Sequence, residues 1–170
     1  MDKRWIYIII ILIIGLSGLY YIVDTSTTVG SAIVGLNSFI LSIPDSFNIE
    51  DTDHGYVSLA NRQTNERIII KDLGKSKSVD EIFEKELSAV VSSENVTIIN
   101  NTTEKHNDIT SKVVYYEKLP NHTFYKVMVF SKFNHTFLIK SINFKDVKSL
   151  NDITYFIIDN INLDHKKKQD

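Results

Sequence analysis

The chain has 170 residues, of which 43% are hydrophobic, 11% are aromatic and 24% are charged, and none is cysteine. This composition is typical of a folded protein and excludes a disordered one. The missing cysteines exclude disulfides, thiol nucleophiles and thiolate metal sites. Residues 36–165 hold 14 of the 19 basic and 18 of the 21 acidic residues, so their net charge is near −4. We expect no nucleic-acid partner, because binding to a phosphate backbone needs a basic stripe.

The segment 5–23, WIYIIIILIIGLSGLYYIV, carries no charge and includes eight isoleucines and three leucines. As a helix it spans about 28 Å, close to the roughly 30 Å hydrocarbon core of a bilayer. Lys3 and Arg4 precede it. Aromatic residues suited to the membrane interface stand at its two ends: Trp5, Tyr7, Tyr20 and Tyr21. The positive-inside rule then predicts that residues 1–4 are cytoplasmic and that the chain after this transmembrane helix lies outside.

A cleaved signal peptide is the alternative interpretation of this segment. The apolar part of a signal peptide is about 7 to 15 residues long and ends at a small-residue cleavage site. Here the run is longer, and Gly30-Ser31-Ala32 is only a weak match to such a site. We therefore favour an uncleaved signal anchor and a single-pass protein of the cell membrane.

After the anchor we expect a small, polar linker at 24–35, an extracytoplasmic domain at 36–165 and a basic tail at 166–170. Alternatively, the first strand already begins within residues 32–36.

Strands are predicted in the first part of the domain at 39–43, 47–50, 56–59 and 66–73. Pro44 ends the first of them, because proline cannot donate to a sheet. In the last one, Ile68 and Ile70 share one face and Ile69 lies on the other. Apolar residues on both faces indicate a sheet that is covered on both sides.

The clearest predicted helix begins at Ser78, which forms a capping box with Glu81. Its apolar stripe has helical spacing and consists of Val79, Ile82, Phe83, Leu87, Val90 and Val91. A second helix is predicted at 146–160. Its buried stripe should consist of Val147, Leu150, Ile153, Phe156, Ile157 and Ile161.

Four strands should lie between these helices, at 96–100, 112–119, 124–130 and 136–144. Short connections at 120–122 and 133–135 favour antiparallel hairpins. The predicted fold class is therefore α+β, with a mostly antiparallel sheet flanked by helices and one N-terminal transmembrane helix.

Residues 37–163 resemble the PsbP/Mog1-like domains. The resemblance is carried by the opening FILSIPDSF, the IIIKDL strand, the capped helix after it and the final strands that end in a helix. It implies an α/β/α sandwich and, for many relatives, a protein-binding role without catalysis. It assigns no functional residue.

The Asn-x-Ser/Thr pattern marks possible glycan acceptors in an outward-facing domain. The first choices are Asn101, Asn121 and Asn134, followed by Asn95 and Asn100. Chance is the simpler explanation, because the chain is rich in these residues and the hairpins already account for Asn121 and Asn134.

Acidic residues and a histidine crowd one predicted loop, namely Glu50, Asp51, Asp53 and His54. They are weak candidates for a calcium site, which needs about 6 to 8 oxygen ligands, and the EF-hand spacing is absent. A solvated turn is the simpler interpretation, so we expect no metal and no cofactor.

No motif of a hydrolase or a metalloprotease is present, so we do not expect an enzyme. His122 and His135 are the pair of histidines that neighbouring turns would bring together. The aromatic residues of the central strands would line a cleft or, more simply, pack in the core: Tyr115, Tyr116, Phe124, Tyr125 and Phe133.

We therefore predict a non-catalytic, membrane-anchored domain that binds a protein or an envelope component. The first alternative is a small-ligand-binding or sensing domain at the membrane face. The second is a hydrolase whose site is assembled from distant parts of the chain.

Overall fold

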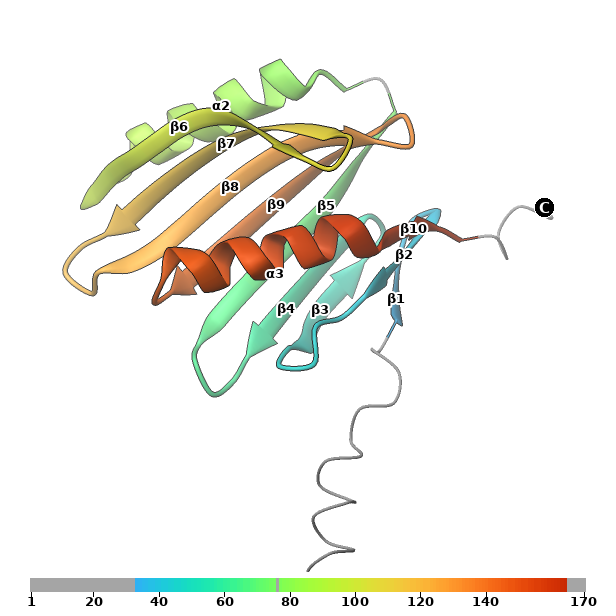
Figure 1. Ribbon diagram of the computed structural model, residues 1–170, viewed down its shortest axis with the longest axis horizontal. Coiled ribbons are helices and arrows are strands. Elements are labelled where there is room, and N and C mark those ends of the chain that lie inside the picture. The colour runs from blue at the N-terminus through green and yellow to red at the C-terminus, as the bar shows by residue number, and fades with distance from the viewer. Residues whose placement is uncertain (1–32, 76, 165–170) are drawn as a thin grey trace, which may run out of the picture. The chain divides into compact units, whose positions relative to one another are not determined.

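The computed structural model describes residues 33–75 and 77–164 (Figure 1). Seven antiparallel strands form the main sheet in the order β3-β4-β5-β9-β8-β7-β6, and three more form a small sheet in the order β1-β2-β10. The strands are β1 (Ile33–Leu36), β2 (Phe39–Ser42), β3 (Asn48–Asp53), β4 (Tyr56–Asn61), β5 (Glu66–Lys75), β6 (Val96–His106), β7 (Ile109–Lys118), β8 (Thr123–Lys132), β9 (His135–Phe144) and β10 (Ile161–Leu163). The helices are α2 (Val79–Val91) and α3 (Val147–Asn160).

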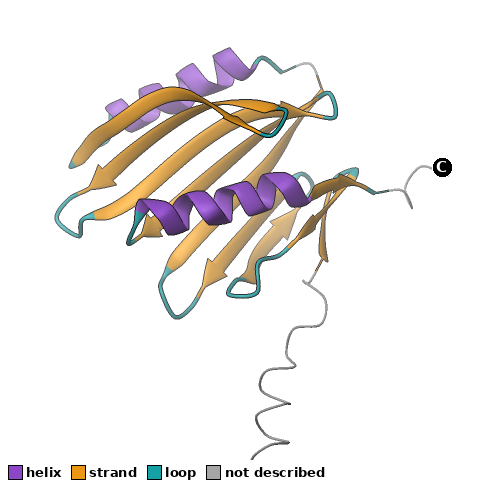
Figure 2. Cartoon of the chain, in the orientation of Figure 1, coloured by secondary structure: helices purple, strands orange, loops and turns teal. Residues whose placement is uncertain are grey.

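Both faces of the main sheet are covered (Figures 1 and 2). Helix α2 packs on one face against β6, β7 and β8, and α3 packs on the other face with the small sheet. Two apolar cores result: Val114, Val127 and Val129 face α2, whereas Met128 and Phe130 face α3. The expected α+β fold with helices on both sides of an antiparallel sheet is confirmed.

The two helices begin where the sequence predicts. The Glu81 N–H donates to Ser78 Oγ at 3.3 Å, and the Ser149 N–H donates to Asp146 Oδ1 at 2.8 Å. Such caps satisfy backbone donors that a helix leaves without partners in its first turn.

The buried stripes of the helices differ from prediction at three residues. Val91 is 63% exposed, and Val147 and Phe156 are each 37% exposed. In α3, Thr154 and Ile158 are buried instead. The buried side of the helix thus includes a polar residue, whose hydroxyl pairs with Ser141 of the sheet at 3.1 Å.

Strands β1, β6 and β10 differ most from prediction. Strand β6 reaches His106 instead of ending at residue 100, and β10 was not predicted at all. Strand β1 begins inside the expected linker, as the alternative interpretation had it. Both hairpins are present, but in the first of them His122 rather than Asn121 takes the positive φ, at 49°.

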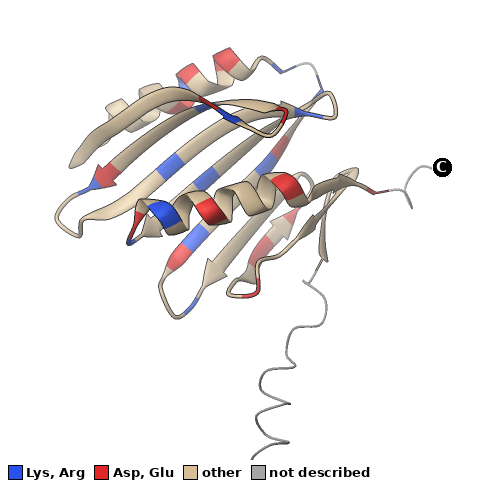
Figure 3. Ribbon diagram, viewed as in Figure 1, with Lys and Arg blue, Asp and Glu red and all other residues tan. Residues whose placement is uncertain are grey.

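The predicted transmembrane helix at 5–23, the linker up to residue 32 and the tail at 166–170 lie outside the described residues. Within 33–75 and 77–164, neither the length nor the apolar character of any helix is sufficient to cross a membrane. Charges of both signs are scattered over the domain (Figure 3).

Candidate functional site

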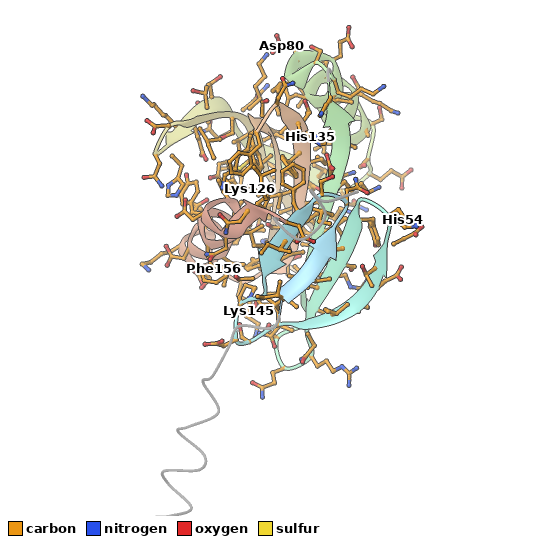
Figure 4. The ribbon with its side chains drawn as sticks, turned by 90° about the vertical axis from the view of Figure 1, so that its right-hand side faces the viewer. His54, Asp80, Lys126, His135, Lys145 and Phe156 are labelled. Atoms are coloured by element: carbon orange, nitrogen blue, oxygen red, sulfur yellow. The ribbon has the colours of Figure 1, made fainter. Side chains whose placement is uncertain are left out.

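A cavity of about 250 Å³ opens at one end of the domain, and we call it the His135 cavity. Two turns and two strand ends meet there: the β1–β2 turn, the β8–β9 turn, the end of β5 and the end of β10. The lining residues are Ser38, Phe39, Lys75, Phe133, His135, Leu163 and Asp164. Figure 4 shows His135 at this end of the molecule.

A buried carboxylate fixes the imidazole of His135. His135 Nδ1 lies 2.9 Å from Asp72 Oδ1, and the Asp72 side chain has no exposed surface. Two further donors hold this carboxylate: the Gly74 N–H at 2.9 Å and Asn37 Nδ2 at 2.8 Å. A ring oriented through one nitrogen presents the other in a fixed direction, which pre-organises a binding group.

The backbone around Asp72 requires two glycines. Gly74 has a φ of 85°, and the β5–β9 register shifts between Asp72 and Lys75, so that Lys75 comes opposite His135. Such bulges re-aim side chains at the ends of strands. At Gly55, with a φ of 71°, a Cβ atom would lie 2.7 Å from Asn37 Nδ2. A side chain there would push Asn37 away from Asp72.

The apolar wall of the cavity consists of stacked aromatic rings. The Phe39 and Phe133 ring centroids are 5.9 Å apart, and the Phe39 and His135 rings form a T-shaped pair with centroids 4.8 Å apart. Phe39 is 1% exposed, whereas Phe133 is 45% exposed. The cavity therefore combines a rigid floor, an exposed aromatic ring and a charged rim formed by Lys75 and Asp164.

A second polar cluster is buried beneath α3 around Lys126 (Figure 4), and we call it the Lys126 cluster. Lys126 Nζ donates to Glu104 Oε2 at 3.1 Å and to Asn151 Oδ1 at 2.9 Å. It also lies 4.7 Å from the ring centroids of both Tyr115 and Tyr155. The two tyrosine hydroxyls complete the cluster, 2.7 Å and 2.9 Å from the Glu104 carboxylate.

Burial shifts the ionisation of this cluster. It lowers the pKa of Lys126 to about 8, although Glu104 favours the charged amine. Burial and then the hydrogen bond to Glu104 raise the pKa of Tyr155 to about 12, and the same causes raise the pKa of Tyr115. Burial alone would raise the pKa of Glu104, but the bonds from Tyr115, Lys126 and Tyr155 together lower it. Every member has a partner, and Lys126 is only 1% exposed, so the cluster holds α3 to the sheet.

The predicted calcium ligands do not converge. Glu50, Asp51 and Asp53 lie on strand β3 rather than in a loop. Arg67 Nη2 binds Glu50 at 2.7 Å, and the His54 N–H donates to Asp53 Oδ1 at 2.7 Å. Over 33–75 and 77–164, no three acidic or histidine residues are grouped so as to hold a metal ion.

The five asparagines of the glycosylation pattern are all exposed. Asn95, Asn121 and Asn134 lie in turns, whereas Asn100 and Asn101 lie on strand β6. Their modification stays a prediction.

The two predicted histidines are not together, because consecutive turns lie at opposite ends of strand β8. His122 pairs with Glu117 at 2.7 Å, and His135 pairs with Asp72. Among the aromatic candidates, Tyr115 and Tyr125 are buried and Tyr116 and Phe124 are partly buried, as core packing requires. Phe133 lines the His135 cavity.

Sequence reasoning did not single out Asp72, Glu104 or Lys126. A signal existed for Lys126 alone: it shares the alternation of Phe124, Met128 and Phe130, so it had to face the core.

No protein-family model matches the sequence, and no curated protein matches it either. The solved structures that resemble the fold include the following two. One is cyanobacterial PsbP (CyanoP) from Synechocystis sp. PCC 6803, with 7% identity, a TM-score of 0.50 and coverage of 81% of this chain and 95% of that one. The other is a protein from Bacteroides thetaiotaomicron VPI-5482, with 13% identity, a TM-score of 0.51 and coverage of 77% and 47%. Such identities show the fold alone, and they confirm the expected PsbP-like fold.

Proposed function

We propose that this chain, whose domain has a PsbP-like fold, is a single-pass membrane protein that holds a non-catalytic binding domain outside the cell membrane. The partner is a protein or an envelope component. The apolar segment at 5–23, with its flanking charges and aromatic residues, supports the anchor.

The observation that carries the binding role is the His135 cavity. An exposed aromatic ring beside a rigid pocket with a polar rim is the arrangement that protein interfaces use for their strongest contacts. Phe133 supplies the ring, Phe39 supplies the buried floor, and Asp72 holds His135 in place. A partner side chain that enters the cavity displaces water from apolar surface and meets a hydrogen-bonding group that is already oriented.

The test places a photo-reactive phenylalanine analogue at position 133 of the full chain in its native membrane. We expect a discrete crosslinked species, and we expect Phe133→Ala to weaken binding of that partner by about tenfold or more. Position 156 is the matched control, because Phe156 is also an exposed phenylalanine but lies on α3 (Figure 4). The same crosslinks from positions 133 and 156, or none from 133, would contradict the proposal.

The volume of the cavity favours a second candidate, a small ligand. A bound solute stabilises the folded chain by RT ln(1 + [L]/Kd), so the unfolding temperature rises with the concentration of the solute. If a solute stabilises the full chain and Phe156→Ala but not His135→Ala, the cavity binds a small ligand instead of a protein.

A further inference from the structure

Strand β6 is one of the two outer strands of the main sheet. It pairs with β7 along one side, and no described strand pairs with its other side. Its backbone donors and acceptors on that side therefore point away from the sheet. An outer strand of this kind is a template for pairing with another chain, and natural proteins usually protect it with charges.

The first part of β6 lacks such charges, and its regular pairing with β7 is interrupted only by a register shift between Ile98 and Asn100. From Val96 to Thr103 the sequence VTIINNTT contains no charged residue. Ile98 is 40% exposed and Ile99 is 50% exposed. A strand segment that is uncharged, partly apolar and open along one side gains hydrogen bonds and buries apolar surface when it pairs.

Other exposed apolar side chains extend the surface at the same end of the strand. Leu119, which is 42% exposed, donates its N–H to the carbonyl of Asn95 at 3.0 Å. Val91 ends helix α2 just before this point and is 63% exposed. Exposed apolar residues that gather in this way mark interaction sites, whereas scattered ones do not.

The other outer strand, β3, has the opposite character. Its sequence NIEDTD carries Glu50, Asp51 and Asp53 on exposed positions. Two copies of β3 would place carboxylates opposite carboxylates, which is unfavourable. Two copies of β6 instead align uncharged residues when they run antiparallel about an axis near Asn100.

We propose that two copies of this chain dimerise by antiparallel pairing of β6 with β6, which joins the two main sheets into one. The pairing is two-fold symmetric, so it closes after two copies and does not extend into a fibre. Attachment to one membrane raises the local concentration of the copies and favours the pairing. A glycan on Asn100 or Asn101 would occupy the same edge, so the dimer requires both residues to be unmodified.

Disulfide crosslinking tests this pairing. The chain has no cysteine of its own, so any disulfide must form between the introduced cysteines. Across an antiparallel pair, opposite residues are about 4.5–5.5 Å apart at Cα, within the range of a disulfide. In the full chain in membranes, we expect Asn100→Cys, which lies opposite its own copy at this axis, to form disulfide-linked dimers. Thr97→Cys and Thr103→Cys should crosslink with each other in a mixture of the two variants but hardly at all with themselves.

Two controls separate this dimer from other contacts. Asp51→Cys on β3 should stay monomeric under the same oxidation. Ile99→Lys should abolish the crosslink of Asn100→Cys and halve the mass of the detergent-solubilised chain, whereas Asp51→Lys should leave both unchanged. Crosslinking that does not depend on position, ladders of more than two copies, a persistent dimer in Ile99→Lys or a glycan on Asn100 or Asn101 would each overturn the proposal.

Discussion

Lys126 is the residue whose placement is energetically most demanding. An ammonium group in the interior loses its hydration, and only well-placed partners offset that loss. Glu104 of β6, Asn151 of α3 and the aromatic faces of Tyr115 and Tyr155 supply these partners. The group therefore keeps its charge near neutral pH, although burial has lowered its pKa to about 8.

This depressed pKa predicts a specific pH dependence of stability. Between the folded pKa of about 8 and the ordinary value of 10.5, the unfolded chain binds more protons at Lys126 than the folded chain does. The free energy of unfolding should therefore rise with pH in this window, by up to about 3 kcal/mol from this group. Above pH 10 the raised pKa of Tyr155, about 12, acts in the opposite direction.

Urea unfolding of the full chain at pH 7 to 10, followed by circular dichroism, measures this effect. Lys126→Met keeps the apolar length of the side chain and should lose the rise between pH 8 and 10. At pH 7 the variant should be less stable by about 2–4 kcal/mol, because Glu104 keeps its tyrosine partners but loses its counter-charge. Lys148→Met, at an exposed position, should retain the pH dependence, and a parallel loss in both variants would contradict the assignment.

At the scale of elements, the N-cap of α2 gives a separate prediction. Ser78→Ala removes the acceptor of the Glu81 N–H and should lower the free energy of unfolding by about 1 kcal/mol. Ser46→Ala, at an exposed turn, is the control and should change it by less than about 0.5 kcal/mol. Equal effects of the two substitutions would show that the cap does not stabilise the helix.

Elements with a strong local signal were predicted from the sequence, and those without one were not. The Ser78 cap, the alternation in β5 and the hairpin at 133–135 each follow from a few neighbouring residues. Strand β10 is three residues long, and it exists because it pairs with β2, far away in the chain. Thr154 of α3 is likewise buried beside Ser141 of the sheet, a contact that helical periodicity does not encode.

At the scale of the whole molecule, the candidate site could not be predicted from the sequence, because its residues are far apart in the chain. Asp72 and His135 are 63 positions apart, and they meet because β5 and β9 are neighbours in the sheet. Phe39 reaches them from the small sheet. Only Phe133 and His135 were noticed from their sequence, and each was noticed for another reason: an aromatic cluster and a pair of turns.

The position of the domain relative to the membrane is the last testable consequence. If the segment 5–23 is an uncleaved anchor, Lys148→Cys on exposed α3 should react with a membrane-impermeant maleimide in intact cells. Lys3→Cys, on the cytoplasmic side, should react only after the membrane is permeabilised. The labelled chain should keep its full length and resist extraction by alkaline carbonate. Labelling of Lys148→Cys only after permeabilisation would place the domain inside the cell. Release of the chain by carbonate would show that the segment 5–23 is not a membrane anchor. In the first case the partner of the His135 cavity would have to be a cytoplasmic one.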